Sequence, residues 1–139
     1  MREILFRGKR KNNGEWVEGN YGEYYGEYYG EYYNEEKKVS CISIPSKETI
    51  SGSLCYDVIP ETVGQYTGLT DKNGTKIFEG DIVNYNGSIH EVVFENRCYN
   101  ARFGIVVEEN ETLSFGMSVP LYFIEVIGNI HDNPELLKE

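Results

Sequence analysis

Three Asn-Gly dipeptides divide this sequence into short segments rich in β-branched and aromatic residues. Asn-Gly suits the positive φ angles of a tight hairpin turn, so each pair predicts a β-hairpin. Asn13-Gly14 would join "EILFRG" to "EWVEG", Asn73-Gly74 lies in "TGLTDKNGTKIFEG", and Asn86-Gly87 would join "DIVNY" to "SIHEVVFE". With a two-residue turn at Asn86-Gly87, His90 would lie opposite Val83 as a half-buried strand residue.

Many short strands with tight turns predict a mainly β fold, and such a sheet must close or stack to cover its apolar face. We expect a small, strongly bent β-barrel, SH3-like or related, with a hairpin extension. Only the tail is typical of a helix, because Asp132 or Asn133 can cap a short C-terminal helix that begins at Pro134. The length of 139 residues suits one domain, so we expect residues 1–139 to form a single domain with a tyrosine-rich insertion at about 20–38.

The tetrad Gly-Glu-Tyr-Tyr occurs three times in succession within Tyr21–Asn34, "YGEYYGEYYGEYYN". A helix is disfavoured, since each glycine costs about 1 kcal/mol relative to alanine and the glutamates repel at i,i+4 spacing. In one extended strand, Tyr24, Tyr28 and Tyr32 would share a face with the glycines. The strand would span roughly 40 Å, so it must bend at a glycine or project outward. We expect it to pair with Val39–Ile44, with "NEEKK" as the turn.

Two interpretations of this repeat stay open. A four-residue slip places identical side chains on identical faces, so slippage of the repeat in the gene would be tolerated by the fold. Alternatively, Tyr24, Tyr28 and Tyr32 form a partner surface, because tyrosine offers a large rigid contact area at little entropic cost. The interleaved glutamates would repel phosphates, so a protein partner or self-association is favoured over nucleic acid.

The charge balance also argues against a general nucleic-acid binder. The chain has 23 acidic and 13 basic residues, a formal charge of -10, and its only basic run is "RGKRK" at Arg7–Lys11, which we interpret as a solvated face. The start of the sequence does not resemble a signal peptide and no segment has the length of a membrane span, so we expect a cytoplasmic protein without a membrane partner.

The sequence contains no recognisable catalytic constellation. Cys41, Cys55 and Cys98 lack Cys-x-x-Cys spacing and are expected to be reduced, and the contexts of His90 and His131 suggest neither a base nor a metal ligand. No phosphate-binding loop or dinucleotide fingerprint occurs. We therefore predict a protein that is not an enzyme, with no metal and no cofactor. The single tryptophan, Trp16, is expected in the core or at the barrel rim.

Three separated stretches together resemble the YopX family of small proteins from phages and prophages of Gram-positive bacteria. They are "MREILFRGKRKNNGEWVEG" at the start, "DVIPETVGQYTGLTDKNGTKIFEGDIV" from Asp57 to Val83, and "EVIGNIHDNPELL" from Glu125 to Leu137. The resemblance implies a mainly β, cytoplasmic, phage-associated protein that self-assembles, and it implies no reaction. Structural roles in turns and strand entries fall to Gly68, Asp71, Gly74, Gly80 and Asp81.

These observations favour a non-enzymatic binding or assembly module encoded by a phage or prophage. Its expected partners are further copies of the chain, or a host or phage protein. The alternative is a nucleic-acid-facing role, either as a small-barrel binder or as an acidic decoy of DNA-binding proteins.

Overall fold

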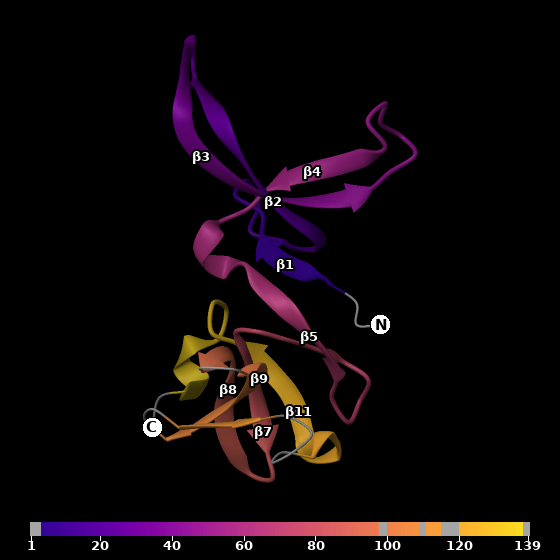
Figure 1. Ribbon diagram of the computed structural model, residues 1–139, viewed down its shortest axis with the longest axis vertical. Helices are drawn as coiled ribbons and strands as arrows, with labels where there is room; N and C mark the ends of the chain where they lie inside the picture. Colours follow the sequence, from indigo (N-terminus) through magenta and orange to yellow (C-terminus); the bar gives the residue numbers. More distant parts are fainter. Residues whose placement is uncertain (1–3, 98–99, 109–110, 115–119, 138–139) are drawn as a thin grey trace. The chain divides into compact units, whose positions relative to one another are not determined.

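The computed structural model describes residues 4–97, 100–108, 111–114 and 120–137, most of which are in β-strands (Figure 1). The chain divides into two compact units, Glu3–Gln65 and a second formed mainly by Tyr66–Glu139, called here the N-terminal and C-terminal units. Each unit is built on antiparallel strand pairs. The predicted mainly β fold is confirmed.

The N-terminal unit is a sheet with the strand order β4-β3-β2-β1. The strands are β1 (Phe6–Lys9), β2 (Trp16–Tyr29), β3 (Tyr32–Pro45) and β4 (Ser53–Asp57). A short 3-10 helix, η1 (Pro60–Thr62), follows β4, and the first residues of β5 (Gly64–Thr70) pair with β1. Strand β4 therefore lies at the edge of this sheet.

Apolar burial fixes the register in the middle of this sheet. Val39, Ile42 and Val58 are buried, and Ile42 lies opposite Tyr21 on one neighbouring strand and Tyr56 on the other. A one-residue slip of β3 would turn Ile42 to the opposite face, so its burial opposes any such slip.

The C-terminal unit contains the remainder of β5, which pairs with β6 (Lys76–Phe78), and a second sheet in the order β10-β9-β8-β7-β11. Its strands are β7 (Asp81–Tyr85), β8 (Ser88–Arg97), β9 (Asn100–Glu108), β10 (Glu111–Ser114) and β11 (Ile124–Asn129). The 3-10 helices η2 (Leu121–Phe123) and η3 (Pro134–Leu137) flank β11. The core of the unit is formed by Ile77, Val83, Val92, Ile105 and Ile124.

The Asn-Gly turns occur where the sequence predicts them. Asn86 and Gly87 have φ angles of 48° and 96°, and Tyr85 pairs with Ser88 across them, as in a two-residue turn of the predicted kind. The predicted pairing of His90 with Val83 is confirmed, and His90 is half-buried. At the other two pairs only the glycine adopts a positive φ, so these connections are longer loops.

Two finer expectations are not confirmed. The sheet order of the C-terminal unit has two ends, and within the described residues no pairing joins β10 to β11 to close a barrel. The predicted C-terminal helix is the four-residue 3-10 helix η3, and the part of the chain that the structure describes contains no α-helix. A single turn forms too few hydrogen bonds to offset the cost of starting an α-helix.

Candidate functional site

The tyrosine repeat forms the outer part of the β2–β3 hairpin, and we call residues 21–39 the tyrosine hairpin. Tyr29 pairs with Tyr32, so the chain reverses at Gly30-Glu31, where Gly30 has a φ of 63°. The predicted turn at "NEEKK" is wrong, because these residues belong to β3. They include no glycine to supply a positive φ. The pairing of Val39–Ile44 with the start of the repeat is confirmed, since Val39 lies opposite Tyr24.

A β-bulge interrupts the hairpin between Tyr25 and Glu27. Gly26, at the bulge, has a φ of 119°. The ring of Tyr33 covers this glycine so closely that a Cβ atom at Gly26 would overlap the Tyr33 hydroxyl. Only glycine combines this backbone angle with such a close approach, so Gly26 sets the place of the bulge.

The hairpin does not bring Tyr24, Tyr28 and Tyr32 to one face as predicted. Cross-strand partners share a face of a β-ribbon and successive residues alternate. Tyr28 lies opposite Tyr33, with ring centroids 4.8 Å apart, whereas Tyr29 lies opposite Tyr32. Tyr28 and Tyr32 are therefore on opposite faces. The prediction is wrong because the chain reverses within the third tetrad.

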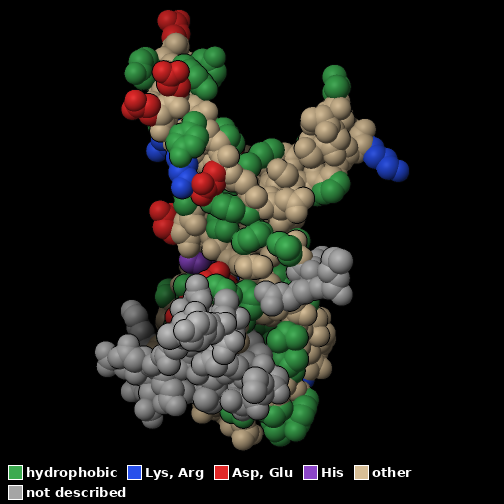
Figure 2. All heavy atoms as spheres, in the orientation of Figure 1, with side chains coloured by type: hydrophobic (Ala, Val, Ile, Leu, Met, Phe, Trp, Pro, Cys, Tyr) green, Lys and Arg blue, Asp and Glu red, His purple; other side chains and the backbone are tan. Residues whose placement is uncertain are grey.

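All tyrosines from Tyr24 to Tyr33 are exposed, and Tyr28 and Tyr32 are 72% and 68% exposed. β1 pairs with β2 only as far as Gly19, and β4 pairs with β3 only from Cys41 onward. In the described residues, the end of the hairpin is thus a two-stranded ribbon that projects past its neighbours (Figure 1). Hydrophobic and acidic side chains lie side by side on it (Figure 2).

Several tyrosine hydroxyls are hydrogen-bonded to carboxylates of the same unit. Tyr24 Oη donates to Asp57 Oδ1 at 2.7 Å, and this bond, with partial burial, raises the pKa of Tyr24. Tyr29 Oη donates to Glu27 Oε2 at 3.0 Å, which likewise raises the pKa of Tyr29. These hydroxyls stay protonated at neutral pH, so the surface offers neutral phenol groups between glutamates.

The basic run at Arg7–Lys11 is not simply a solvated face. The Arg7 guanidinium lies 4.7 Å and the Lys9 ammonium 5.8 Å from the ring centroid of half-buried Trp16. The Arg10 guanidinium lies 4.4 Å from the ring centroid of Tyr56 on β4. Such stacking orders cationic side chains. The sequence shows the basic run, but not that one of its aromatic partners is Tyr56, from a strand distant in sequence.

A cavity of about 270 Å³ adjoins Arg10 at the edge of the N-terminal sheet. Its lining comes from the β1–β2 connection and from β4, namely Arg10, Lys11, Asn12, Cys55, Tyr56 and Asp57. The tyrosine hairpin and this cavity are the two candidate binding features of the N-terminal unit.

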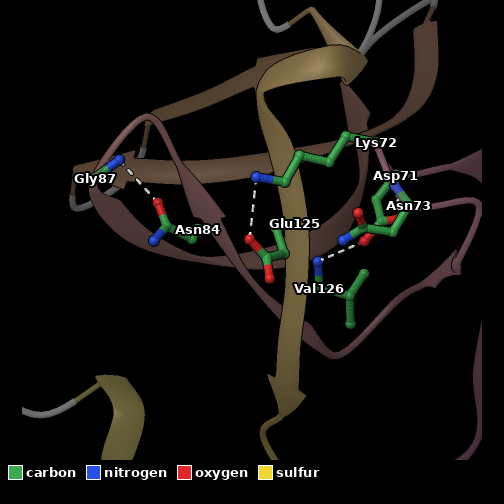
Figure 3. A network of polar contacts seen from close by, with 7 residues as sticks. All are labelled: Asp71, Lys72, Asn73, Asn84, Gly87, Glu125 and Val126. Atoms are coloured by element: carbon green, nitrogen blue, oxygen red, sulfur yellow. Dashed lines mark hydrogen bonds and ion pairs between the residues drawn. The ribbon is translucent and has the colours of Figure 1, made fainter.

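In the C-terminal unit, Asp71 anchors the loop between β5 and β6 to β11 (Figure 3). Its Oδ1 accepts the backbone N–H groups of Asn73 and Thr75, and its Oδ2 accepts that of Val126 at 2.9 Å. Lys72 and Glu125 form an ion pair of 3.2 Å beside it. The buried carboxylate of Asp71 thus serves local structure.

A second cavity, of about 230 Å³, lies near this network. Exposed Tyr122 and Phe123 line it together with Lys72, Asn84, Asn86, Gly87 and Glu125. The polar groups are partly engaged with one another, since Asn84 Oδ1 accepts the Gly87 N–H at 2.8 Å (Figure 3).

The other residues of the C-terminal turns have geometric or local roles. Gly68, Gly74 and Gly80 adopt φ angles of 85°, 82° and 92°, which side chains rarely tolerate. Asp81 is buried, and its Oδ2 accepts the Phe78 N–H at 2.7 Å across the turn that precedes β7.

The groups that most often take part in catalysis are dispersed. His90 lies on β8 and His131 follows β11, while Cys41 and Cys55 lie on β3 and β4; Cys98 is outside the described residues. Burial and a hydrogen bond with Cys55 raise the pKa of the Cys41 thiol to about 11, so it is protonated at neutral pH. Within the described ranges, no three His, Cys, Asp or Glu side chains are grouped as a metal site would require.

The part of the chain that the structure describes includes no helix with the length and apolar character to cross a membrane.

The fold places the chain among mainly β proteins built on antiparallel sheets. A family model described as YopX protein matches residues 5–138, so the chain belongs to the YopX family. The structure is similar to the crystal structure of protein EF1440 from Enterococcus faecalis, with a TM-score of 0.55 and 24% sequence identity over 99% of this chain and 100% of that one. At this identity the similarity shows the fold alone. No curated protein matches the sequence.

Proposed function

We propose that this chain is a non-enzymatic assembly module of phage or prophage origin, and that copies associate through the tyrosine hairpin. The phage origin and a cytoplasmic location belong to the proposal and are supported by the resemblance to the YopX family. The observation that carries the assembly role is the row of exposed tyrosines on a projecting two-stranded ribbon.

The exposed rings of the hairpin together offer an area close to that of a specific protein–protein contact. A tyrosine side chain buries roughly 150–250 Å², so the exposed parts of the six rings from Tyr24 to Tyr33 offer on the order of 700 Å². A stable protein–protein interface buries roughly 800 Å² per partner, and the rings lie on both faces of the hairpin, so they supply most of this area only where partners cover both faces. The glutamates between the rings oppose a phosphate backbone and favour protein as the partner.

Light scattering behind a sizing column tests this proposal. We compare the native chain with a Tyr28→Ser/Tyr32→Ser variant, which removes one exposed ring from each face of the hairpin. Tyr122→Ser is the matched control, because Tyr122 is 69% exposed but belongs to the C-terminal unit. We expect the native chain and the control to form the same assembly. We expect the double variant to form a smaller assembly or to stay monomeric. A native chain that stays monomeric at high concentration, or a double variant of native mass, would reject the proposal.

A further inference from the structure

The cavity at the edge of the N-terminal sheet has the chemistry of a carboxylate-binding site. Stacking on Tyr56 holds the Arg10 guanidinium at 4.4 Å from the ring, and Arg10 is half-buried. A guanidinium held in a plane is pre-organised to bind a carboxylate through two parallel hydrogen bonds. Exposed Lys11 adds a second positive charge to the same cavity.

The lining of this cavity carries a net positive charge. Among the described residues, no carboxylate lies within ion-pair distance of Arg10 or Lys11. Asp57 also lines the cavity, and the hydrogen bond from the neutral Tyr24 hydroxyl to its Oδ1 at 2.7 Å does not remove its charge, so Arg10 and Lys11 (+2) and Asp57 (-1) leave the lining at +1. The Asp57 backbone oxygen accepts the Lys11 N–H at 3.0 Å.

The backbone beside the cavity also suits an extended ligand. β4 is the last strand in the order of its sheet, and only its end is bonded to the β1–β2 connection, where Lys11 N–H donates to the Asp57 oxygen and Arg10 forms a β-bridge with Val58. Cys55 and Tyr56 lie on this edge strand just before that contact and line the cavity. An extended segment can add to such an edge through main-chain hydrogen bonds, while side-chain pockets give specificity. These features favour an acidic, extended segment as a ligand.

The same unit carries a segment with this chemistry. The tyrosine hairpin is extended and projecting, and its charged side chains are Glu23, Glu27, Glu31, Glu35, Glu36, Lys37 and Lys38. Lys38 forms an ion pair of 3.1 Å with Glu23, which leaves the end of the hairpin strongly acidic. Glu31, Glu35 and Glu36 are exposed near the turn.

We infer that the Arg10–Lys11 cavity receives the acidic end of the tyrosine hairpin of a second copy, an inference that rests on the proposed self-assembly. The contact joins two different surfaces of the chain. Such a head-to-tail contact produces a ring if the rotation between copies closes and an open filament if it does not. Each copy both donates a hairpin and accepts one.

Charge reversal on the two surfaces tests this inference. One variant carries Arg10→Glu and Lys11→Glu, and the other carries Glu31→Lys and Glu35→Lys. Each variant alone presents like charges at the contact, so we expect light scattering to show a loss of mass for both. In an equimolar mixture, variants that alternate pair opposite charges at every contact, so we expect association to return, with the native mass in a filament or in a ring with an even number of copies. Lys47→Glu, an exposed change on the β3–β4 connection, is the control that should keep native mass.

The outcomes separate this inference from the proposed function. If the native chain assembles and Tyr28→Ser/Tyr32→Ser does not, but both charge-reversal variants keep native mass, the cavity is not the docking site and self-assembly stands. A mixture of folded variants that fails to associate also overturns the inference. A monomeric native chain rejects self-assembly itself. Trp16 fluorescence shows whether the Arg10→Glu/Lys11→Glu variant is folded. If it is not, the variant Lys11→Glu alone replaces it in the mixture.

Discussion

At the scale of single residues, three glycines in the same position of the tetrad have three different roles. A Cβ atom at Gly22 would meet only the Cys41 sulfur at 3.7 Å, one at Gly26 would overlap Tyr33, and one at Gly30 would meet nothing within 4 Å. Gly26 and Gly30 have positive φ angles. The three tetrads have the same sequence, but their glycines have different environments because the bulge lies at Gly26 and the turn at Gly30.

This difference predicts opposite effects of the same substitution. Gly26→Ala adds a side chain at a strained φ against the Tyr33 ring, so we expect a local cost of about 2 kcal/mol and at least about a tenfold loss of amide protection in the hairpin. Gly22→Ala is the matched control and should leave protection unchanged or raise it slightly, since alanine is less costly to order. Hydrogen exchange followed by NMR measures both. Equal losses in the two variants would contradict the assigned bulge.

At the scale of elements, the hairpin has a fixed base and an adaptable end. Its base is held by Val39 and Ile42, which are buried. Residues 26–37, between Tyr25 and Lys38, pair only with each other and have no further neighbouring strand in the described part of the chain. Deleting the tetrad Gly26–Tyr29 should therefore shorten the ribbon and leave the pairing of the base unchanged. This expectation agrees with a repeat whose length can vary.

We expect this deletion to change the free energy of unfolding of the N-terminal unit by less than about 0.5 kcal/mol. Urea unfolding followed by the fluorescence of Trp16, the single tryptophan, measures it in the correct unit. Ile42→Ala serves as the comparison and should cost about 2–5 kcal/mol, because it leaves a cavity in the core. A deletion as costly as Ile42→Ala would mean that the end of the hairpin stabilises the unit.

The elements also show which features are predictable from sequence. The Asn86-Gly87 turn and the pairing of His90 with Val83 are predictable, because a two-residue turn fixes the register of its strands. The turn of the repeat is not, since each tetrad offers an equivalent glycine and only tertiary packing selects among them. The stacking of Arg10 on Tyr56 depends on β4 lying beside the end of β1, which no local pattern indicates.

At the scale of the whole molecule, a net charge of -10 opposes self-association, because every copy repels every other. Salt therefore distinguishes the two ways in which the hairpin can bind. If tyrosine packing alone drives assembly, added salt screens the repulsion between copies, and the mass of the assembly measured by light scattering should rise. If the acidic hairpin enters the Arg10–Lys11 cavity, added salt also screens the attraction at the contact and the mass should fall.

We expect the second result. The screening length falls from about 10 Å at 0.1 M salt to about 3 Å at 1 M, so the dissociation constant should rise at least about tenfold across this range. Light scattering at fixed protein concentration measures the change. The Arg10→Glu/Lys11→Glu variant provides the control: it lacks the attraction, so its residual association should strengthen with salt. A native assembly that also strengthens would place the binding energy in the tyrosine rings and leave the cavity without a role in assembly.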